Sequence, residues 1–507
     1  MADSQGYLIN FVIGTISIIF ITVLLKSTRA KSHLPPSPFA FPIIGHLHLL
    51  GPKPHQLLHT LSNQYGPVFQ LYLGSLPCVI CTSSETGKEL FKTFDTTFLN
   101  RPYNSCVDFI AYGGNGFISA PHGSYWKFLK KIVISQLLNA KTLDSLIPVR
   151  HDELTRLIKY LSQKAKDGNF VELEAELKKM TNNVISRMIM SKRCSHEEDE
   201  AGSIRKIISD YSIVMGTFNL SDRIWFLKNI DLQGVRKKSK EIRKRFDILI
   251  EKILKEHEEA RKNKEIREVK DLLDILLHIT QDDSMEIKLT REHIKAFILD
   301  IFAAATDSSS VTIEWALAEL INHPNIMKKA VEEIDLVVGK NRLIKESDIP
   351  NLPYLQAIIK ETLRLHPTAP LILRESIEDC TICGYHIPEK TTVFFNVWGV
   401  GRDPTYWENP LEFRPERFVE TQLDVRGRDF QLLPFGSGRR MCPGMSLGLM
   451  VVHVTLGAMI QCFEWKAGQN GNLTNVDMEE GIGITLPRAN TLVCVPVARL
   501  DLIPFSM

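Results

Sequence analysis

The sequence predicts a mostly helical α+β protein with small β-sheets and one N-terminal transmembrane helix. Long apolar runs of helical character recur, such as Arg291 to Asn322 and Leu447 to Phe463, whereas the strand-like segments are short. The 507 residues, 44% of them hydrophobic, are enough to bury a large core, and no linker, repeat or low-complexity tract divides them. We therefore expect a membrane anchor with its basic flank in residues 1–33 and a single domain in residues 34–507.

The membrane helix is predicted from an uncharged segment. Tyr7 to Leu25 is a run of 19 residues interrupted only by small or weakly polar side chains, and a helix needs about 20 apolar residues to cross a bilayer. Lys26, Arg29 and Lys31 follow at once, and positive charge on that side places the following domain in the cytosol. A cleaved signal peptide is the alternative. The position of the basic cluster, after the apolar run, favours an uncleaved single-pass anchor.

Charge and cysteine content argue against two other classes of protein. A net charge of only +2 gives no basic surplus for phosphate groups, so nucleic acid is not an expected partner. The nine cysteines are scattered, which fits a reducing compartment better than a disulfide scaffold. Two C-x-x-C pairs, Cys78 to Cys81 and Cys380 to Cys383, lie in strand-like sequence, where ordinary packing explains them better than zinc or a disulfide.

One cysteine lies in a glycine-rich turn directly before a predicted helix. The segment Pro434-Phe-Gly-Ser-Gly-Arg-Arg-Met-Cys442-Pro-Gly-Met precedes the apolar run from Leu447. Amides and the dipole at a helix N-terminus favour an anion and lower a thiol pKa. The glycines let backbone approach a flat group, and Arg439 and Arg440 offer charge to its anionic edge. A buried cysteine near a helix start is the alternative.

The full string is more specific than the cysteine alone. Phe435, Gly438, Arg440, Cys442 and Gly444 match the spacing F-x-x-G-x-R-x-C-x-G. This string resembles the haem-binding loop of the cytochrome P-450 superfamily, and the resemblance covers essentially the whole chain. It implies the fold of that superfamily, with Cys442 as the axial thiolate ligand of the iron of haem b. A thiolate there pushes electron density to the iron and favours O–O cleavage, as in a monooxygenase that uses O2 (EC 1.14 class).

A long helix is predicted from about Arg291 to Asn322, with Thr290 as its N-cap and His323-Pro324 at its end. Small and polar residues occupy its middle, where they would let a flat ring approach a buried helix. In the resembled family this segment is A/G-G-x-D/E-T-T/S, which implies that Asp307 and Ser308 relay protons as catalytic residues. Ala305 stands where glycine is usual, and Ser308 keeps the hydroxyl where threonine is usual.

Further motifs occur in the order that the family implies. Glu361-Thr-Leu-Arg364 and Phe413-Arg-Pro-Glu-Arg417 imply a buried structural network of Glu361, Arg364 and Arg417. Four side chains are implied to contact the haem besides the cysteine: Trp126, Lys130, Arg374 and Arg440. Lys130 replaces the usual arginine of W-x-x-x-R, so that a bidentate contact becomes a point charge.

The electrons must come from outside, because no flavin or NADPH fingerprint is visible in the sequence. The resemblance implies a separate membrane-bound NADPH–cytochrome reductase as partner, and localisation in the endoplasmic reticulum membrane with the catalytic domain, residues 34–507, facing the cytosol. Basic residues near the cysteine side, Lys127, Lys131 and Arg439, are expected to meet the acidic surface of the reductase.

The substrate is expected to be a small, planar, apolar molecule. The segment Met478 to Arg488 is similar to that of flavone synthases II and flavanone 2-hydroxylases of plants. This likeness implies oxidation of a flavanone at C2, giving a flavone by C2–C3 desaturation or a 2-hydroxyflavanone. Leu373 stands near the position where isoflavonoid synthases carry a lysine. The absence of that lysine weakens the case for an aryl-migration reaction. The pocket would be lined by four residues that are equally compatible with plain core packing: Ile118, Ala304, Leu371 and Ile484.

Several alternatives stay open at this point. The chain could hydroxylate another plant metabolite, such as a pterocarpan, an isoflavonoid or a terpenoid. A haem-thiolate isomerase or dehydratase that needs no reductase is a second alternative, which Asp307 and Ser308 disfavour. A haem sensor or carrier without catalysis is a third. The sequence does not separate desaturation from hydroxylation.

Overall fold

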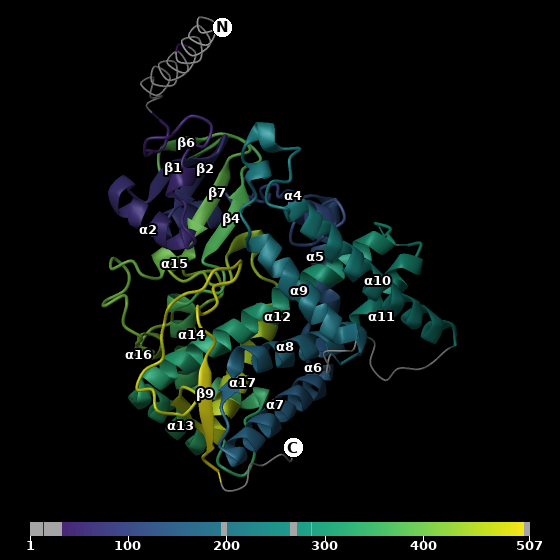
Figure 1. Ribbon diagram of the computed structural model, residues 1–507, viewed down its shortest axis with the longest axis vertical. Helices are drawn as coiled ribbons and strands as arrows, with labels where there is room; N and C mark the ends of the chain where they lie inside the picture. Colours follow the sequence, from purple (N-terminus) through teal and green to yellow (C-terminus); the bar gives the residue numbers. More distant parts are fainter. Residues whose placement is uncertain (1–13, 15–32, 194–199, 264–270, 285, 501–507) are drawn as a thin grey trace, which may run out of the picture.

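The longest described helix, α12 (Arg291–Asn322), runs through the middle of the molecule, with the other elements arranged around it (Figure 1). The computed structural model describes residues 14, 33–193, 200–263, 271–284 and 286–500. Except for Gly14, the predicted membrane helix lies outside the described residues. Helices predominate and the strands form three small sheets, so the prediction of a mostly helical α+β fold is confirmed.

The helices that surround α12 vary in length from one turn to seven turns or more. Their bounds are α2 Pro54–Tyr65, α3 Ser84–Lys88, α4 Ser105–Ile110, α5 Ser124–Ile132, α6 Ala140–Ser145, α7 Ile147–Asp167, α8 Leu173–Met190, α9 Glu200–Gly216, α10 Val235–Lys262, α11 Leu272–Gln281, α13 Pro324–Val337, α14 Pro353–Leu365, α15 Val397–Val400, α16 Glu416–Val419 and α17 Met445–Cys462. Helices α8, α14 and α17 pack directly against α12 and enclose the main core with it.

The largest sheet lies at one end of the molecule, in the order β1-β2-β7-β4 (Figure 1). Strand β2 pairs antiparallel with β1 and parallel with β7, and β7 pairs antiparallel with β4. A second sheet has the order β3-β9-β8, and β5 and β6 form a hairpin. The strand bounds are β1 Val68–Leu73, β2 Leu76–Cys81, β3 Val171–Glu172, β4 Leu371–Glu375, β5 Cys380–Ile382, β6 Tyr385–Ile387, β7 Thr392–Asn396, β8 Phe463–Ala467 and β9 Val493–Ala498.

Three of the four C-x-x-C cysteines lie in strands, as their apolar sequence predicts, and Cys383 lies in the turn after β5. Cys78 and Cys81 are buried in β2, and Cys380 begins β5. All described cysteines are free. Burial raises the pKa of the Cys78 thiol to about 12 and that of Cys380 to about 11. These thiols therefore behave as small apolar side chains in the described part of the chain.

The bounds of α12 follow from its sequence. The Thr290 hydroxyl accepts a hydrogen bond from the His293 N–H, which satisfies one of the free amides at the helix start. The helix ends before Pro324, which begins α13. Both α12 and α17 are long and apolar enough to cross a membrane, but 67% of the apolar window of each is buried within the protein. Interior packing therefore explains the apolar character of both helices.

Glu361 on α14 lies between two buried guanidinium groups. Arg364 donates to both carboxylate oxygens of Glu361 at 2.7 Å, and Arg417 donates to Oε1 at 3.0 Å. The side chains of Glu361 and Arg364 are 0% exposed. Arg364 also donates to the carbonyls of Gly401 and Pro410, so the network fixes the long loop between α15 and α17 against α14. The structure thus brings the three predicted network residues together.

Replacing Glu361 by alanine would leave two buried cations without their anion. We expect Glu361→Ala to lower the free energy of unfolding by about 3–5 kcal/mol, measured by urea unfolding followed by far-UV circular dichroism. Lys329→Met is the control: it removes a 57%-exposed partner of Glu416 and should cost about 1 kcal/mol or less. Equal losses in the two variants would contradict a stabilising role of the buried network.

Candidate functional site

The loop that precedes α17 holds Cys442 at its end. The Cys442 N–H donates to the Phe435 carbonyl at 2.9 Å, which closes the loop into a tight turn. Gly438 has φ +71°, and a Cβ there would lie 2.2 Å from Oδ1 of Asp95. Only glycine fits this position, because both the backbone conformation and the close approach exclude a side chain. Cys442 itself is exposed although α17 behind it is a core helix.

The environment of the Cys442 sulfur corrects one sequence prediction. Backbone N–H groups of Gly444 and Met445, at the start of α17, do lower the thiol pKa as the helix N-terminus suggested. The protein atoms packed around the sulfur have the larger effect, however: although Cys442 has exposed surface, they disfavour a charge on the sulfur and raise the pKa of the thiol above its usual value. An iron ion bound to the sulfur would favour the thiolate.

Three guanidinium groups meet near this loop without carboxylate partners. No described carboxylate forms an ion pair with Arg101, Arg374 or Arg440, and Nε of Arg101 is buried without a hydrogen bond. Arg101 and Arg374 donate to the same carbonyl, that of Leu373, at 3.1 and 3.0 Å. Burial lowers the pKa of Arg101 to about 10 and that of Arg440 to about 9. Burial, Arg101 and Arg440 together lower the pKa of Arg374 well below its usual range.

Trp126 on α5 lies beside this cluster. The Arg440 guanidinium stacks on its ring, 4.3 Å from the centroid, and Nζ of Lys130 lies 5.2 Å from the same centroid. Nε1 of Trp126 and Nε2 of His122 are buried without a hydrogen-bond partner. Lys130 donates to the Arg439 carbonyl instead of joining the three arginines. The structure therefore gathers Trp126, Arg374 and Arg440 as predicted site residues and places Lys130 at their edge.

This set of donors fits haem b. The unpaired cations and N–H groups match a flat group with two carboxylates, and the cysteine beside them matches an iron ligand. When bound, the haem supplies the O2 activation that protein side chains lack. Cys442 would hold the iron, and the carboxylates would be held by Arg101, His122, Trp126, Arg374 and Arg440.

Helix α12 has an open side and a packed side in its middle. Ala304 is exposed and Ala305 and Ser308 are half-buried, whereas Thr306 and Asp307 are buried. The Ser308 hydroxyl donates to the Ala304 carbonyl at 2.8 Å, one turn back on the same side. A small side chain and a hydroxyl therefore share the open side of the helix.

Asp307 points to the packed side, toward α8 and α9. Its carboxylate accepts a hydrogen bond from Ser212 at 3.1 Å and lies 3.9 Å from Nζ of Lys178. Burial alone lowers the pKa of Lys178, but Asp307 and Glu174 outweigh burial and raise it. The Glu174 side chain is 30% exposed, so this chain of polar groups extends from α12 to the surface. The side chains of Asp307 and Ser308 share no described hydrogen bond and lie on different sides of the helix.

The four predicted pocket residues come from separate segments. Ala304 lies on α12 and Leu371 at the start of β4, whereas Ile118 and Ile484 lie outside helices and strands. Ile118 is held through its N–H, which donates to Asp300 at 2.8 Å. Ile484 is 45% exposed, and its backbone lies against the end of α9 at Gly216. Leu371, at the start of β4, packs against the apolar cluster of α2, β1 and β2. At least part of its side chain is therefore in core packing.

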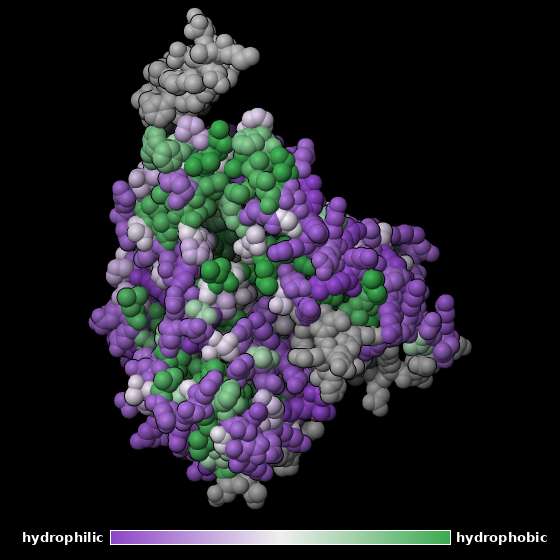
Figure 2. Space-filling model, in the orientation of Figure 1, coloured by the Kyte–Doolittle hydropathy of each residue, from purple (hydrophilic) through white to green (hydrophobic). Residues whose placement is uncertain are grey.

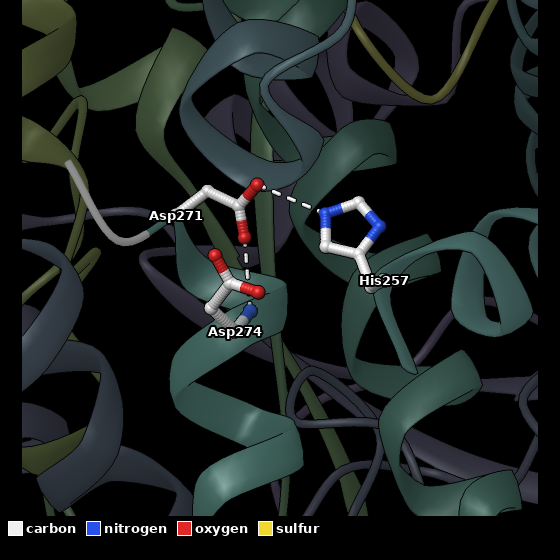
Figure 3. Close-up of side chains that lie close together, drawn as sticks. All are labelled: His257, Asp271 and Asp274. Atoms are coloured by element: carbon white, nitrogen blue, oxygen red, sulfur yellow. Dashed lines mark hydrogen bonds and ion pairs between the residues drawn. The ribbon is translucent and has the colours of Figure 1, made fainter. Parts of the chain in front are cut away.

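A second group of possible metal ligands lies at the junction of α10 and α11 (Figure 3). Nε2 of His257 lies 3.0 Å from Oδ2 of Asp271, and Oδ1 of Asp271 accepts a hydrogen bond from the Asp274 N–H at 2.9 Å. Ser191 also donates to Oδ2 of Asp271, at 2.8 Å. Nδ1 of His257 bonds to the carbonyl of Ile253. These contacts give the group a structural role: they hold the start of α11 against α10 and α8.

Two residues of the site were missed by sequence reasoning. Arg101 is an arginine before a proline in a loop, and His122 is a histidine in a loop; neither pattern carries a chemical signal. Their role becomes visible only when β4 and α5 bring Arg374 and Trp126 to them.

The fold and the site together define a haem-thiolate protein. The Cytochrome P-450 family model matches residues 35–495. Cytochrome P-450 93A3 of Glycine max is 52% identical over 511 residues, which cover 99% of this chain and 100% of that protein. The 3,9-dihydroxypterocarpan 6A-monooxygenase of Glycine max is 51% identical and covers 96% and 98%. A zebra fish cytochrome P-450 structure with progesterone has a TM-score of 0.75 at 26% identity, covering 87% and 99%. The chain belongs to the cytochrome P-450 family.

Membership gives the reaction class and the cofactors. The chain is a cytochrome P-450 monooxygenase, an oxidoreductase of the EC 1.14 class. The family uses haem b, O2 and NADPH, with the electrons delivered by a partner reductase.

Replacing the Cys442 sulfur tests the ligand assignment directly. We expect Cys442→Ser to lose the red-shifted absorption band of the ferrous–CO complex, because that shift requires a thiolate ligand. Cys383→Ser is the matched control, since Cys383 is an exposed cysteine in the turn between β5 and β6. If Cys442→Ser kept the shifted band, Cys442 would not be the ligand.

Proposed function

We propose that this chain uses electrons from a reductase to oxidise a flavonoid-type ring system. The proposed substrate is a flavanone, which is oxidised at C2. The observation that carries the reaction type is the pairing of Cys442, in a cationic site, with a neighbouring helix α12 whose open side carries Ala304 and Ser308. The product would be a flavone, by C2–C3 desaturation, or a 2-hydroxyflavanone.

Ser308 and Asp307 divide the proton relay between them. The Ser308 hydroxyl, on the open side, holds a proton at Oγ near the substrate. Asp307 connects the packed side to Lys178 and Glu174, and Glu174 reaches solvent. Protons would pass from solvent to Asp307 through these charged groups. Their transfer to Ser308 would require the Asp307 side chain to turn toward the open side, because no described hydrogen bond joins the two. This arrangement supports oxygen chemistry and disfavours an isomerase, which needs no proton supply from solvent of this kind.

The segment that suggested a flavanone is held rigidly beside α12. Glu480 accepts hydrogen bonds from Gln56 and Trp398, both at 2.6 Å, and Leu486 accepts one from Nε1 of Trp315 on α12 at 2.8 Å. With both of its ends fixed, the loop 481–487 carries Ile484 toward the end of α9. This geometry supports a role of the loop in shaping a flat apolar pocket.

A pterocarpan is the second candidate substrate. The relative whose name specifies a 3,9-dihydroxypterocarpan is 51% identical over nearly the full length of both chains. Oxidation of a pterocarpan therefore has support from overall similarity, whereas oxidation of a flavanone has support from the Met478 to Arg488 segment.

Basic side chains on the cysteine side support docking of the reductase. Lys127 and Lys131 on α5 are exposed, and the Arg439 side chain is 56% exposed in the cysteine loop. Lys130, on the same helix, donates to the Arg439 carbonyl, so α5 lies beside the loop that ends at Cys442. An acidic partner surface would be attracted there, and its approach would be weakened by salt.

An apolar surface at one end of the molecule supports contact with a lipid bilayer. Apolar side chains gather at the end of the molecule where β1 and β2 lie (Figure 2). Two segments, one around Ile44 and one around Arg223, meet at the turn between these strands. The Gly74 N–H donates to the Ile44 carbonyl, and the Ser75 N–H donates to the Arg223 carbonyl. The exposed members are Phe39, Phe41, Ile43, Leu76, Trp225, Phe226, Ile230 and Leu232. Such an exposed apolar patch fits a catalytic domain that rests on the membrane.

Product analysis tests the proposed function. Microsomes that contain this chain and an NADPH–cytochrome reductase should convert a flavanone to a flavone or 2-hydroxyflavanone only when NADPH and O2 are present. A 3,9-dihydroxypterocarpan and a triterpene are assayed in parallel. Turnover of the pterocarpan or the triterpene without any turnover of the flavanone would overturn the flavanone assignment. The same preparation tests the membrane proposal, since the protein should sediment with the microsomes at high salt.

The proton relay has its own test. We expect Ser308→Ala to lower the product formed per NADPH consumed by about tenfold or more, because the helix loses its hydroxyl on the open side. Ser310→Ala is the matched control, since the Ser310 hydroxyl is buried and bonds back to the Thr306 and Asp307 carbonyls. Equal coupling in Ser308→Ala and in the unaltered enzyme would remove Ser308 from the relay.

A further inference from the structure

We propose that Asp300 is a positioning residue that fixes the substrate-side loop 116–118 against helix α12. Asp300 lies on α12, two turns before Asp307, and is 2% exposed. Its carboxylate accepts hydrogen bonds from the backbone N–H groups of Phe117 and Ile118, the latter at 2.8 Å. The proposal rests on the proposed function in one respect, because Ile118 is taken to face the substrate.

The lack of a side chain at Gly116 leaves room for the carboxylate of Asp300. A Cβ at Gly116 would lie 2.4 Å from Oδ2 and 3.0 Å from Cγ of Asp300. Both groups are buried, so neither can move aside without opening the packing between the loop and α12. A side chain at position 116 would push the loop off the helix, and the loop would lose its two hydrogen bonds.

The same loop is tied to the haem-binding residues on its other side. The Phe117 ring stacks on Trp126 at a centroid distance of 5.9 Å and an interplanar angle of 8°. The carbonyl of Ala120 accepts a hydrogen bond from Arg440 at 2.6 Å. The loop thus bridges α12 and the side chains that would hold the haem carboxylates. Asp300 provides the bond to α12 that sets the distance of Ile118 from the haem.

Asp300 acts through the loop and does not touch substrate. Its second oxygen, Oδ1, is buried and has no hydrogen-bond partner, so it does not line an open cavity. No described cation forms an ion pair with Asp300; the titratable groups that face it are Tyr125 on α5 and Tyr211 on α9. Burial raises the pKa of Asp300 to about 7. Both the neutral and the charged carboxyl group keep an oxygen for the two N–H groups, and so does an asparagine.

A pair of azoles that bind haem iron tests the proposal without using the substrate. Imidazole is too small to reach beyond the iron, whereas 4-(4-biphenylyl)imidazole extends into the pocket. We expect Asp300→Ala and Gly116→Ala each to weaken the biphenyl azole about tenfold, which corresponds to about 1.4 kcal/mol, measured by ferric difference spectra of the holoenzyme. Imidazole affinity and the ferrous–CO band should not change. Asp300→Asn should restore the affinity to within about twofold.

The double variant Gly116→Ala/Asp300→Ala tests whether the two substitutions weaken azole binding through the same contact or through two independent effects. The added methyl no longer meets a carboxylate in this variant, so its affinity for the biphenyl azole should equal that of Asp300→Ala. Additive losses would overturn the proposal, as would an Asp300→Asn variant as weak as Asp300→Ala. If Asp300→Ala fails to retain haem, Gly116→Ala decides, and unchanged affinity there overturns the proposal. Failure of flavanone turnover in the unaltered enzyme would overturn the proposed function and leave this result intact.

Discussion

The burial of three guanidinium groups without carboxylate partners is the constraint on which the site depends. Isolated buried charges are costly, and here backbone carbonyls and an indole ring supply the compensation. Arg440 donates to the carbonyls of Leu99 and Ala120 and stacks on Trp126. The fold must therefore bring five segments together around these guanidinium groups. They are β4, α5, the cysteine loop and the loops that carry Leu99 and Ala120. An anion with two carboxylates would complete this arrangement, and haem binding would then stabilise the folded form of this region.

The network around Glu361 shows the opposite solution to the same problem. There a carboxylate lies between Arg364 and Arg417, and the remaining guanidinium donors find backbone carbonyls. Each guanidinium nitrogen of the two arginines donates within the protein, so the network leaves no nitrogen free for a ligand. Its effect is to fix the loop that leads to Cys442. One cluster of buried arginines is thus structural because its anion is internal, and the other forms a binding site because its anion is external.

Features that depend on short stretches of sequence were predictable. The bounds of α12 follow from the Thr290 cap and Pro324, and the cysteine loop follows from its own spacing. Features that depend on distant segments were not. Arg101 becomes a site residue only because β4 places Leu373 and Arg374 beside it. The net direction of the Cys442 pKa shift also escaped prediction, because burial is a property of the whole fold and outweighs the two amides that the local sequence supplies.

The two sides of α12 connect these constraints to the outcome of the reaction. The packed side carries Asp307 and its ion pair with Lys178, so the proton supply that we propose would run through the contact with α8. The open side carries Ala304 and Ser308, and this is the side on which Ala305 adds a methyl where the family usually has none. With haem bound, a methyl there would change the space on the open side and would leave the proposed proton supply behind the helix intact. Substrate position and proton delivery can therefore vary independently in this fold, and differences in reaction outcome among relatives should arise from the open side of α12 and the loops that face it.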